Sequence, residues 1–242
     1  MKRELVIGKY TLESLTNGMY SSPLDMYREY IQNAVDSFDE VIAAGIEIAD
    51  KLVIDVDIDA EEKSVTIRDN GVGIRAADAT NTLLDIGNSQ KSRMTSRGFR
   101  GIGRLAGLSY CDKLTFQTSF KGEELLTVIE FDASLLKELL LPGKDESESV
   151  EDVINRIVTI KTEKESANRR YFYVKLEGVW NEGGLIELET VKDYLLQHAP
   201  LQFSKEFKWG RTIAEKMRLN GYQIPQYKIR LNGETLFKPY SD

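Results

Sequence analysis

The stretch Glu29–Asp36, which reads EYIQNAVD, organises the interpretation of this sequence. At about 100° per residue, an α-helix places Glu29, Asn33 and Asp36 within about 60° of one another. The opposite side of the same helix is apolar, which predicts that it packs on a core. Its residues are Tyr27, Ile31, Ala34 and Phe38. The stretch therefore predicts a helix that presents two carboxylates and an amide in a row.

The expected bounds of this helix follow from its flanks. Ser22 and Pro23 favour a helix start, because serine caps free N–H groups and proline fits the first turn. Gly45 is a plausible C-cap. By itself this pattern also describes an ordinary amphipathic helix with a solvated face, so the neighbouring motifs decide between the two interpretations.

A second motif, Asp69–Ile74, reads DNGVGI. The segments 52–58 and 64–68 before it alternate apolar with polar residues and predict a hairpin. An aspartate where the second strand ends, followed by Gly71 and Gly73, can project its carboxylate into a cleft while the backbone turns. A simple tight turn is the alternative.

The third motif lies in a basic, glycine-rich region. Residues 87–111 contain no acidic residue, and Gly98–Gly103 leads into an expected helix at 104–108. Backbone N–H groups at a helix start, unobstructed by side chains, bind phosphate well. A flexible basic loop and a local nucleic-acid contact are the alternatives. The motif is not a P-loop, since no Gly-Lys-Ser/Thr closes it.

Composition limits the function further. The chain has 242 residues and a net charge of −7, which argues against a surface generally coated by nucleic acid. Its one cysteine, Cys111, allows no intrachain disulfide and suits a reducing compartment, so we expect a cytoplasmic protein. Neither a signal peptide nor a membrane-spanning run is expected.

The remaining sequence predicts further strands and helices. Strands are expected at 113–120, 125–131, 153–162 and 171–176, and helices at 75–86, 191–199 and 212–219. An Asn-Gly turn predicts a late hairpin over 227–237 without a visible sheet partner. We therefore expect one domain at 1–185 and, at 186–242, a helical linker with the start of a second domain.

Together the three motifs resemble those of the GHKL ATPases, which include gyrase-type topoisomerases, ninety-kilodalton heat-shock chaperones, MutL mismatch-repair proteins and sensor histidine kinases. The similarity covers roughly residues 20–180. The matching positions are Glu29-x-x-x-Asn33-x-x-Asp36, Asp69-x-Gly71-x-Gly73 and Gly98-x-x-Gly101-x-Gly103. Ser89-x-Lys91 with the following glycine-rich run looks most like the mismatch-repair branch, and the chaperone branch has a similar helix motif. The presence of Glu29 argues against the histidine-kinase branch.

The resemblance implies an α+β Bergerat fold: a two-layer sandwich with a mixed, mostly antiparallel sheet and helices on one face. It implies that Glu29 is the general base, that Asn33 holds Mg²⁺, and that Asp69 accepts a hydrogen bond from adenine, with Gly73 close to the ring. Residues 87–103 would form a lid over ATP. The further implied nucleotide-binding residues are Asp36, Gly71, Ser89, Lys91, Gly98, Arg100, Gly101, Ile102 and Gly103.

Many relatives also carry a threonine before a late strand, on the adenine side. The strand expected at 171–176 has none. The resemblance leaves open whether Thr115, Thr118 or a water takes that place.

The implied function is ATP binding and slow Mg²⁺-dependent hydrolysis by the N-terminal module of a larger chaperone-like or DNA-repair-like protein. Lid closure and homodimer formation on ATP binding are expected, with an unknown protein client. Two alternatives stay open: a nucleotide switch that never hydrolyses ATP, and a DNA-contacting module that uses the basic stretch Lys91–Arg104.

Overall fold

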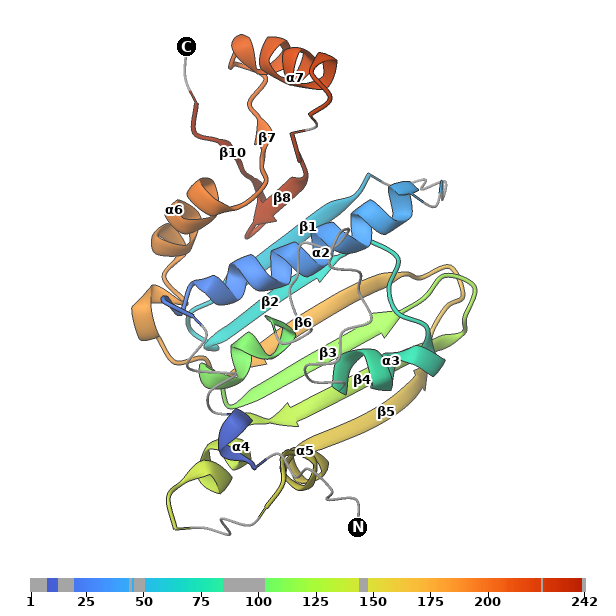
Figure 1. Cartoon of the computed structure of the whole chain (residues 1–242), viewed down its shortest axis with the longest axis vertical. Coiled ribbons are helices and arrows are strands. Elements are labelled where there is room, and N and C mark those ends of the chain that lie inside the picture. The colour runs from blue at the N-terminus through green and yellow to red at the C-terminus, as the bar shows by residue number, and fades with distance from the viewer. Residues whose placement is uncertain are drawn as a thin grey trace, which may run out of the picture.

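The computed structural model describes residues 8–12, 20–43, 45, 51–84, 103–143, 148–222 and 224–240. Its centre is an eight-stranded sheet in the order β5-β4-β3-β6-β2-β1-β8-β9 (Figure 1). All neighbouring strands in it are antiparallel except β1 and β8. The strands are β1 Val53–Asp59, β2 Ser64–Asp69, β3 Lys113–Ser119, β4 Leu125–Asp132, β5 Val158–Lys164, β6 Tyr171–Glu177, β8 Lys228–Leu231 and β9 Glu234–Thr235. The expected α+β fold with a mixed, mostly antiparallel sheet is confirmed.

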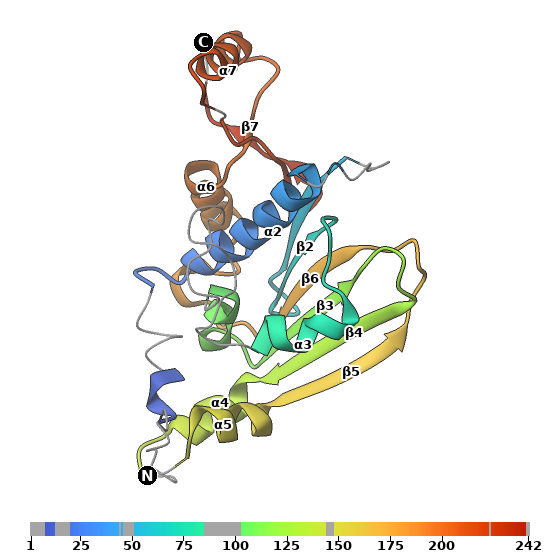
Figure 2. The ribbon, with the colours of Figure 1, turned by 45° about the vertical axis from the view of Figure 1, so that its right-hand side comes forward.

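Helices lie over one face of this sheet (Figure 1, Figure 2). The long helix α2 contacts β2, the 3₁₀ helix η1 and α6, and α3 contacts β3 and β4. None of the described helices covers the opposite face of the sheet, here called the open face (Figure 2). The helices are α2 Asp25–Ala43, α3 Ala76–Leu84, η1 Gly103–Ser109, α4 Ala133–Leu140, α5 Val150–Ile157, η2 Glu182–Gly184, α6 Leu188–His198 and α7 Trp209–Leu219. None of the described helices is both long and apolar enough to span a bilayer.

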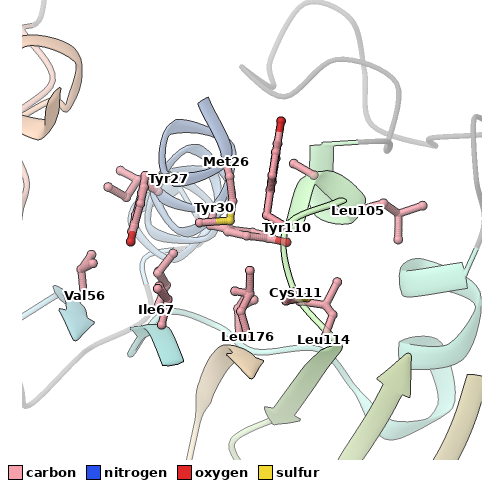
Figure 3. Close-up of a cluster of buried hydrophobic side chains, with 14 of the residues drawn as sticks. Met26, Tyr27, Tyr30, Val56, Ile67, Leu105, Tyr110, Cys111, Leu114 and Leu176 are labelled. Atoms are coloured by element: carbon pink, nitrogen blue, oxygen red, sulfur yellow. The ribbon is translucent and has the colours of Figure 1, made fainter. Parts of the chain in front are cut away.

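The apolar side of α2 packs on the sheet as its spacing predicts. Tyr27, Ile31 and Phe38 are fully or almost fully buried. Figure 3 shows Tyr30 of the same helix lying over Leu176 of β6, with its ring extending toward Tyr110. Each buried side chain of this size contributes about 1.5–3 kcal/mol of hydrophobic stabilisation. The helix is therefore a fixed platform for its polar face.

The predicted hairpin of β1 and β2 is confirmed, with Ile54 paired to Asp69 at one end and Asp59 to Ser64 at the other. Its turn is stabilised by the side chain of Asp59, which accepts hydrogen bonds from the backbone N–H groups that follow it. Alternation directs Ile67 and Asp69 to the helix-covered face. The hairpin thus positions the aspartate of the second motif beneath α2.

The prediction of one strand is wrong for its first half. The segment predicted as a strand over 153–162 begins as helix α5 and becomes β5 only at Val158. The physical reason is a capping box: Ser149 accepts a hydrogen bond from the N–H of Asp152, and the Asp152 carboxylate accepts one from the N–H of Ser149. These bonds satisfy free N–H groups at the helix start and favour a helix over an extended chain.

The late hairpin has a sheet partner, contrary to expectation. β8 pairs in parallel with β1, joining Ile229 to Ile54, and β9 pairs with β8. A parallel partner comes from a distant part of the chain and leaves no local signal. A second, two-stranded sheet joins β7 (Gln202–Phe203) to β10 (Phe237–Lys238). The division into domains at 185/186 stays a prediction.

Candidate functional site

The first and third motifs meet in space. Glu29 lies half-buried on α2, and a methyl group built on Gly103, the first residue of η1, would come 2.1 Å from Oε2 of Glu29. Burial raises the pKa of the Glu29 carboxyl, while Arg28, whose guanidinium lies 3.5 Å from it, opposes the shift. A partly desolvated carboxylate with a raised pKa is suited to accept a proton.

This contact makes Gly103→Ala a test of the position of Glu29. The added methyl group meets the far end of a flexible side chain, so we expect the free energy of unfolding to change by less than about 1 kcal/mol. For the catalytic role that the GHKL resemblance implies for Glu29, displacing the carboxylate should lower the rate of ATP hydrolysis about 10-fold. Phosphate release and urea unfolding measure the two quantities, and a turnover equal to wild type would show that the carboxylate does not act from this position.

Asn33 and Asp36 follow Glu29 along α2. Asn33 is half-buried, whereas Asp36 is buried and accepts a hydrogen bond of 3.1 Å from the amide of Gln32. Among the described residues, no group of three or more His, Cys, Asp or Glu side chains could hold a metal ion by itself. Mg²⁺ bound with nucleotide needs few protein ligands, because phosphates and waters supply the rest. The amide oxygen of Asn33 fits such a role.

Asp69 of the second motif is 4% exposed at the end of β2. Its Oδ1 accepts a hydrogen bond of 2.8 Å from the N–H of Gly71. Burial raises the pKa of Asp69 to about 7, although that bond and the nearby Arg170 oppose the shift. A buried carboxyl group whose orientation is fixed by a hydrogen bond and whose pKa is shifted is a candidate binding residue.

Both glycines of the second motif lie in crowded positions. A methyl group on Gly71 would come 2.2 Å from Oγ of Ser37. Gly73 has φ +72°, and a methyl group there would come 2.1 Å from the backbone oxygen of Ser119. Gly73 is thus required by backbone conformation and by the close approach of β3.

We expect Gly73→Ala to destabilise the fold by about 3 kcal/mol or more, because a strained φ is combined with a backbone collision. Gly122→Ala is the matched control: its φ is +93°, but nothing lies within 4 Å of an added methyl group. Strain alone should cost about 1 kcal/mol there. Urea unfolding of both variants separates the effects, and equal losses would contradict the importance of the contact with Ser119.

Most of the third motif lies outside the described residues, namely Gly98, Arg100, Gly101 and Ile102, and so do the predicted nucleotide-binding residues Ser89 and Lys91. The described part starts at Gly103. The helix expected at 104–108 is a 3₁₀ helix, η1. It is anchored by Tyr30 of α2, whose hydroxyl donates to the carbonyl of Arg104 and accepts from the N–H of Gly107, both at 3.0 Å.

Three side chains that the motifs do not include hold the second motif in place. Ser37 accepts a hydrogen bond from the N–H of Val72, and Thr118 accepts one from the N–H of Ile74. Arg170 donates to the carbonyl of Gly71. The sequence suggested Thr118 only as one of two candidate hydroxyls, and nothing marked the other two residues, because these contacts join segments far apart in the chain.

Thr118 and Thr115 lie on different faces of the sheet. Thr118 shares a row with Asp69, since both pair with Phe172 of β6. Thr115 lies in the row of Glu130 and Lys175, on the open face. The geometry thus places only the Thr118 hydroxyl next to the second motif.

Several curated proteins are similar to part of this chain. A chaperone protein HtpG from Acinetobacter baylyi is 31% identical over 129 residues, which are 46% of this chain and 20% of that protein. Chaperone proteins HtpG from Streptomyces coelicolor and Nocardia farcinica are 24% and 29% identical, over 49% and 46% of this chain and 22% and 20% of their own lengths. The chain thus spans about a fifth of the length of these relatives.

A family model described as "Histidine kinase-, DNA gyrase B-, and HSP90-like ATPase" matches residues 23–164. That range includes α2, the β1–β2 hairpin with the second motif, and η1. It covers more than half of the chain and includes both Glu29 and Gly103, through which the first and third motifs meet. The chain therefore belongs to the family of histidine kinase-, DNA gyrase B- and HSP90-like ATPases.

Proposed function

We propose that this chain binds ATP on the helix-covered face of the sheet, between α2 and the second motif, and hydrolyses it slowly. The observation that carries the proposal is the contact between Glu29 and Gly103, which joins a desolvated carboxylate to the end of the glycine-rich motif. Family membership and the buried position of Asp69 support the same assignment.

In this proposal the two ends of the nucleotide have different partners. Asp69 accepts a hydrogen bond from the adenine amino group, and Gly71 and Gly73 let the backbone turn close to the ring. The phosphates lie toward Asn33 and the lid, residues 87–103, which closes over them. Mg²⁺, when bound, neutralises part of the phosphate charge.

Glu29 serves as the base in the hydrolytic step. A water oxygen forms a bond to the γ-phosphorus while the bond from that phosphorus to the β,γ-bridging oxygen breaks. The water gives a proton to the Glu29 carboxylate, and ADP leaves with the bonding electron pair. The raised pKa of Glu29 makes its carboxylate a stronger base than that of an ordinary glutamate.

We further propose that the chain is the ATPase module of a larger, chaperone-like cytoplasmic protein. The HtpG relatives support this, because they are about five times as long as the matched region and favour the chaperone branch over the mismatch-repair branch. ATP-driven dimerisation of the modules belongs to the same proposal. Slow turnover is expected of the isolated module, since catalysis by positioning needs every part of the site.

Calorimetric titration with ATP and GTP, with and without Mg²⁺, tests the proposal together with an assay of phosphate release. We expect one ATP per chain and GTP binding at least about 10-fold weaker, because guanine presents a carbonyl where adenine donates to Asp69. Failure to bind ATP would contradict the proposal. Tight Mg-ATP binding without turnover, in the full-length protein as well, would support the switch alternative.

A further inference from the structure

The open face of the sheet contains a hollow of ≈ 390 Å³ near the end where β2 leads into the second motif. Asp55 of β1 and Arg68 of β2 are paired in register and line it. Their neighbours along each strand, Ile54 and Ile67, are buried on the helix-covered side. This hollow, here called the open-face pocket, thus opens on the other face of the sheet from the proposed nucleotide site, and the two share Asp69 where β2 ends.

The charge of the open-face pocket is strongly positive. Four cationic side chains line it: Lys51, Arg68, Arg169 and Arg170. Of its two acidic residues, Asp55 is bound by both nitrogens of the Arg230 guanidinium fork, Nη2 at 2.7 Å from Oδ2, and Asp69 is buried toward the opposite face. Among the described residues, no carboxylate lies within ion-pair distance of Arg68 or Arg169, although both attract the nearby carboxylate of Glu165 and help to lower its pKa. In a chain of net charge −7, this local excess of cations is unusual.

The walls of the pocket are held in place by contacts with the backbone and with a ring. Asn70 accepts a hydrogen bond of 2.8 Å from the N–H of Val53 and donates one of 3.0 Å to the carbonyl of Lys51. The guanidinium of Arg68 lies 4.9 Å from the centre of the Tyr171 ring. The ring contact positions the guanidinium of Arg68, and a preorganised donor loses little entropy on binding. Neighbouring cations repel one another unless an anion joins them.

We propose that the open-face pocket binds a small anion that carries phosphate groups. Guanidinium groups match phosphate oxygens in pairs of parallel hydrogen bonds, and two or three of them can share one multiply charged ligand. The volume suits a molecule of the size of a small metabolite.

The surroundings of the pocket favour a small ligand over a nucleic acid. The next rows of the open face carry Asp57 and two glutamates, Glu130 and Glu177, that are ion-paired with lysines. An extended polynucleotide laid across the sheet would meet lysines that are already paired with carboxylates there. The favourable potential is thus confined to the pocket itself.

Titration calorimetry with inorganic pyrophosphate, at constant ionic strength, tests the proposal on the full chain. We expect saturable binding by wild type and a loss of affinity of at least about 10-fold in Arg68→Gln/Arg169→Gln. The control Lys121→Gln/Lys164→Gln removes the same charge from exposed sites outside the pocket and should stay within about 2-fold of wild type. Arg170 is left intact because it holds Gly71.

Three results would overturn the proposal. Pyrophosphate affinity that is unchanged in Arg68→Gln/Arg169→Gln would place the binding elsewhere, for instance at the nucleotide site. Citrate binding as tight as pyrophosphate would remove the preference for phosphate, and tighter binding of a ten-nucleotide single strand would favour nucleic acid. Thermal melts verify that the double variant folds. The single variant Arg169→Gln changes only an exposed loop residue, and its affinity for pyrophosphate should fall less than that of the double variant.

Discussion

Replacing Glu29 by glutamine should leave ATP affinity within about 3-fold of wild type and lower the rate of hydrolysis at least about 100-fold. Glutamine keeps the shape of the side chain against Gly103 but cannot accept the proton of the attacking water. Calorimetry gives the affinity, and phosphate release under saturating ATP gives the rate. This pattern is that of a group needed in the transition state and not for ground-state binding.

Glu40→Gln is the matched control for this variant. Glu40 lies on the same helix, is exposed, and is not part of any motif. The Glu40→Gln variant should hydrolyse ATP at the wild-type rate. If Glu29→Gln and Glu40→Gln hydrolyse ATP equally fast, another group is the base, and the role of Glu29 has to be given up.

Asp69→Asn should weaken ATP binding about 100-fold, because a buried donor and acceptor would no longer match. In wild type, Oδ1 of Asp69 accepts a hydrogen bond from the N–H of Gly71. In the variant, the single amide oxygen of asparagine has to accept this bond. The amide NH₂ would then face the amino group of adenine, and two donors would be opposed. Asp193→Asn, the same change at an exposed position of α6, serves as the control and should bind ATP normally.

The same variant should be more stable than wild type without nucleotide, and increasingly so at high pH. The folded-state pKa of Asp69, about 7, lies above the value of about 3.9 for an unfolded chain. Folding thus favours the neutral carboxyl. The wild-type protein therefore loses stability as the pH rises from the unfolded pKa of Asp69 toward its folded pKa. The stability gained by Asp69→Asn should grow by about 2 kcal/mol between pH 5 and pH 8.

Urea unfolding at both pH values, without nucleotide, measures this difference. A gain that does not change with pH would show that the carboxyl is ionised at low cost in the folded protein. Loss of ATP binding together with increased stability would identify Asp69 as a residue kept at the expense of the fold, as is common for binding groups.

Local rules predicted the parts of this protein whose conformation is decided by neighbouring residues. The spacing of apolar residues gave α2, and alternation gave the β1–β2 hairpin. The first two motifs were placed on those elements correctly. The motif order was specific enough to predict the family and the fold, because each motif requires a definite helix end, strand end or turn.

Only the tertiary structure decided the contacts between distant segments. It brought Glu29 to Gly103, joined Ser37 to Val72 and gave β8 its parallel partner β1. Such contacts depend on how whole elements pack, and no periodicity within a segment encodes them. For the same reason the open-face pocket was invisible in the sequence: its cations come from three separate segments, and only the folded sheet puts them beside one another.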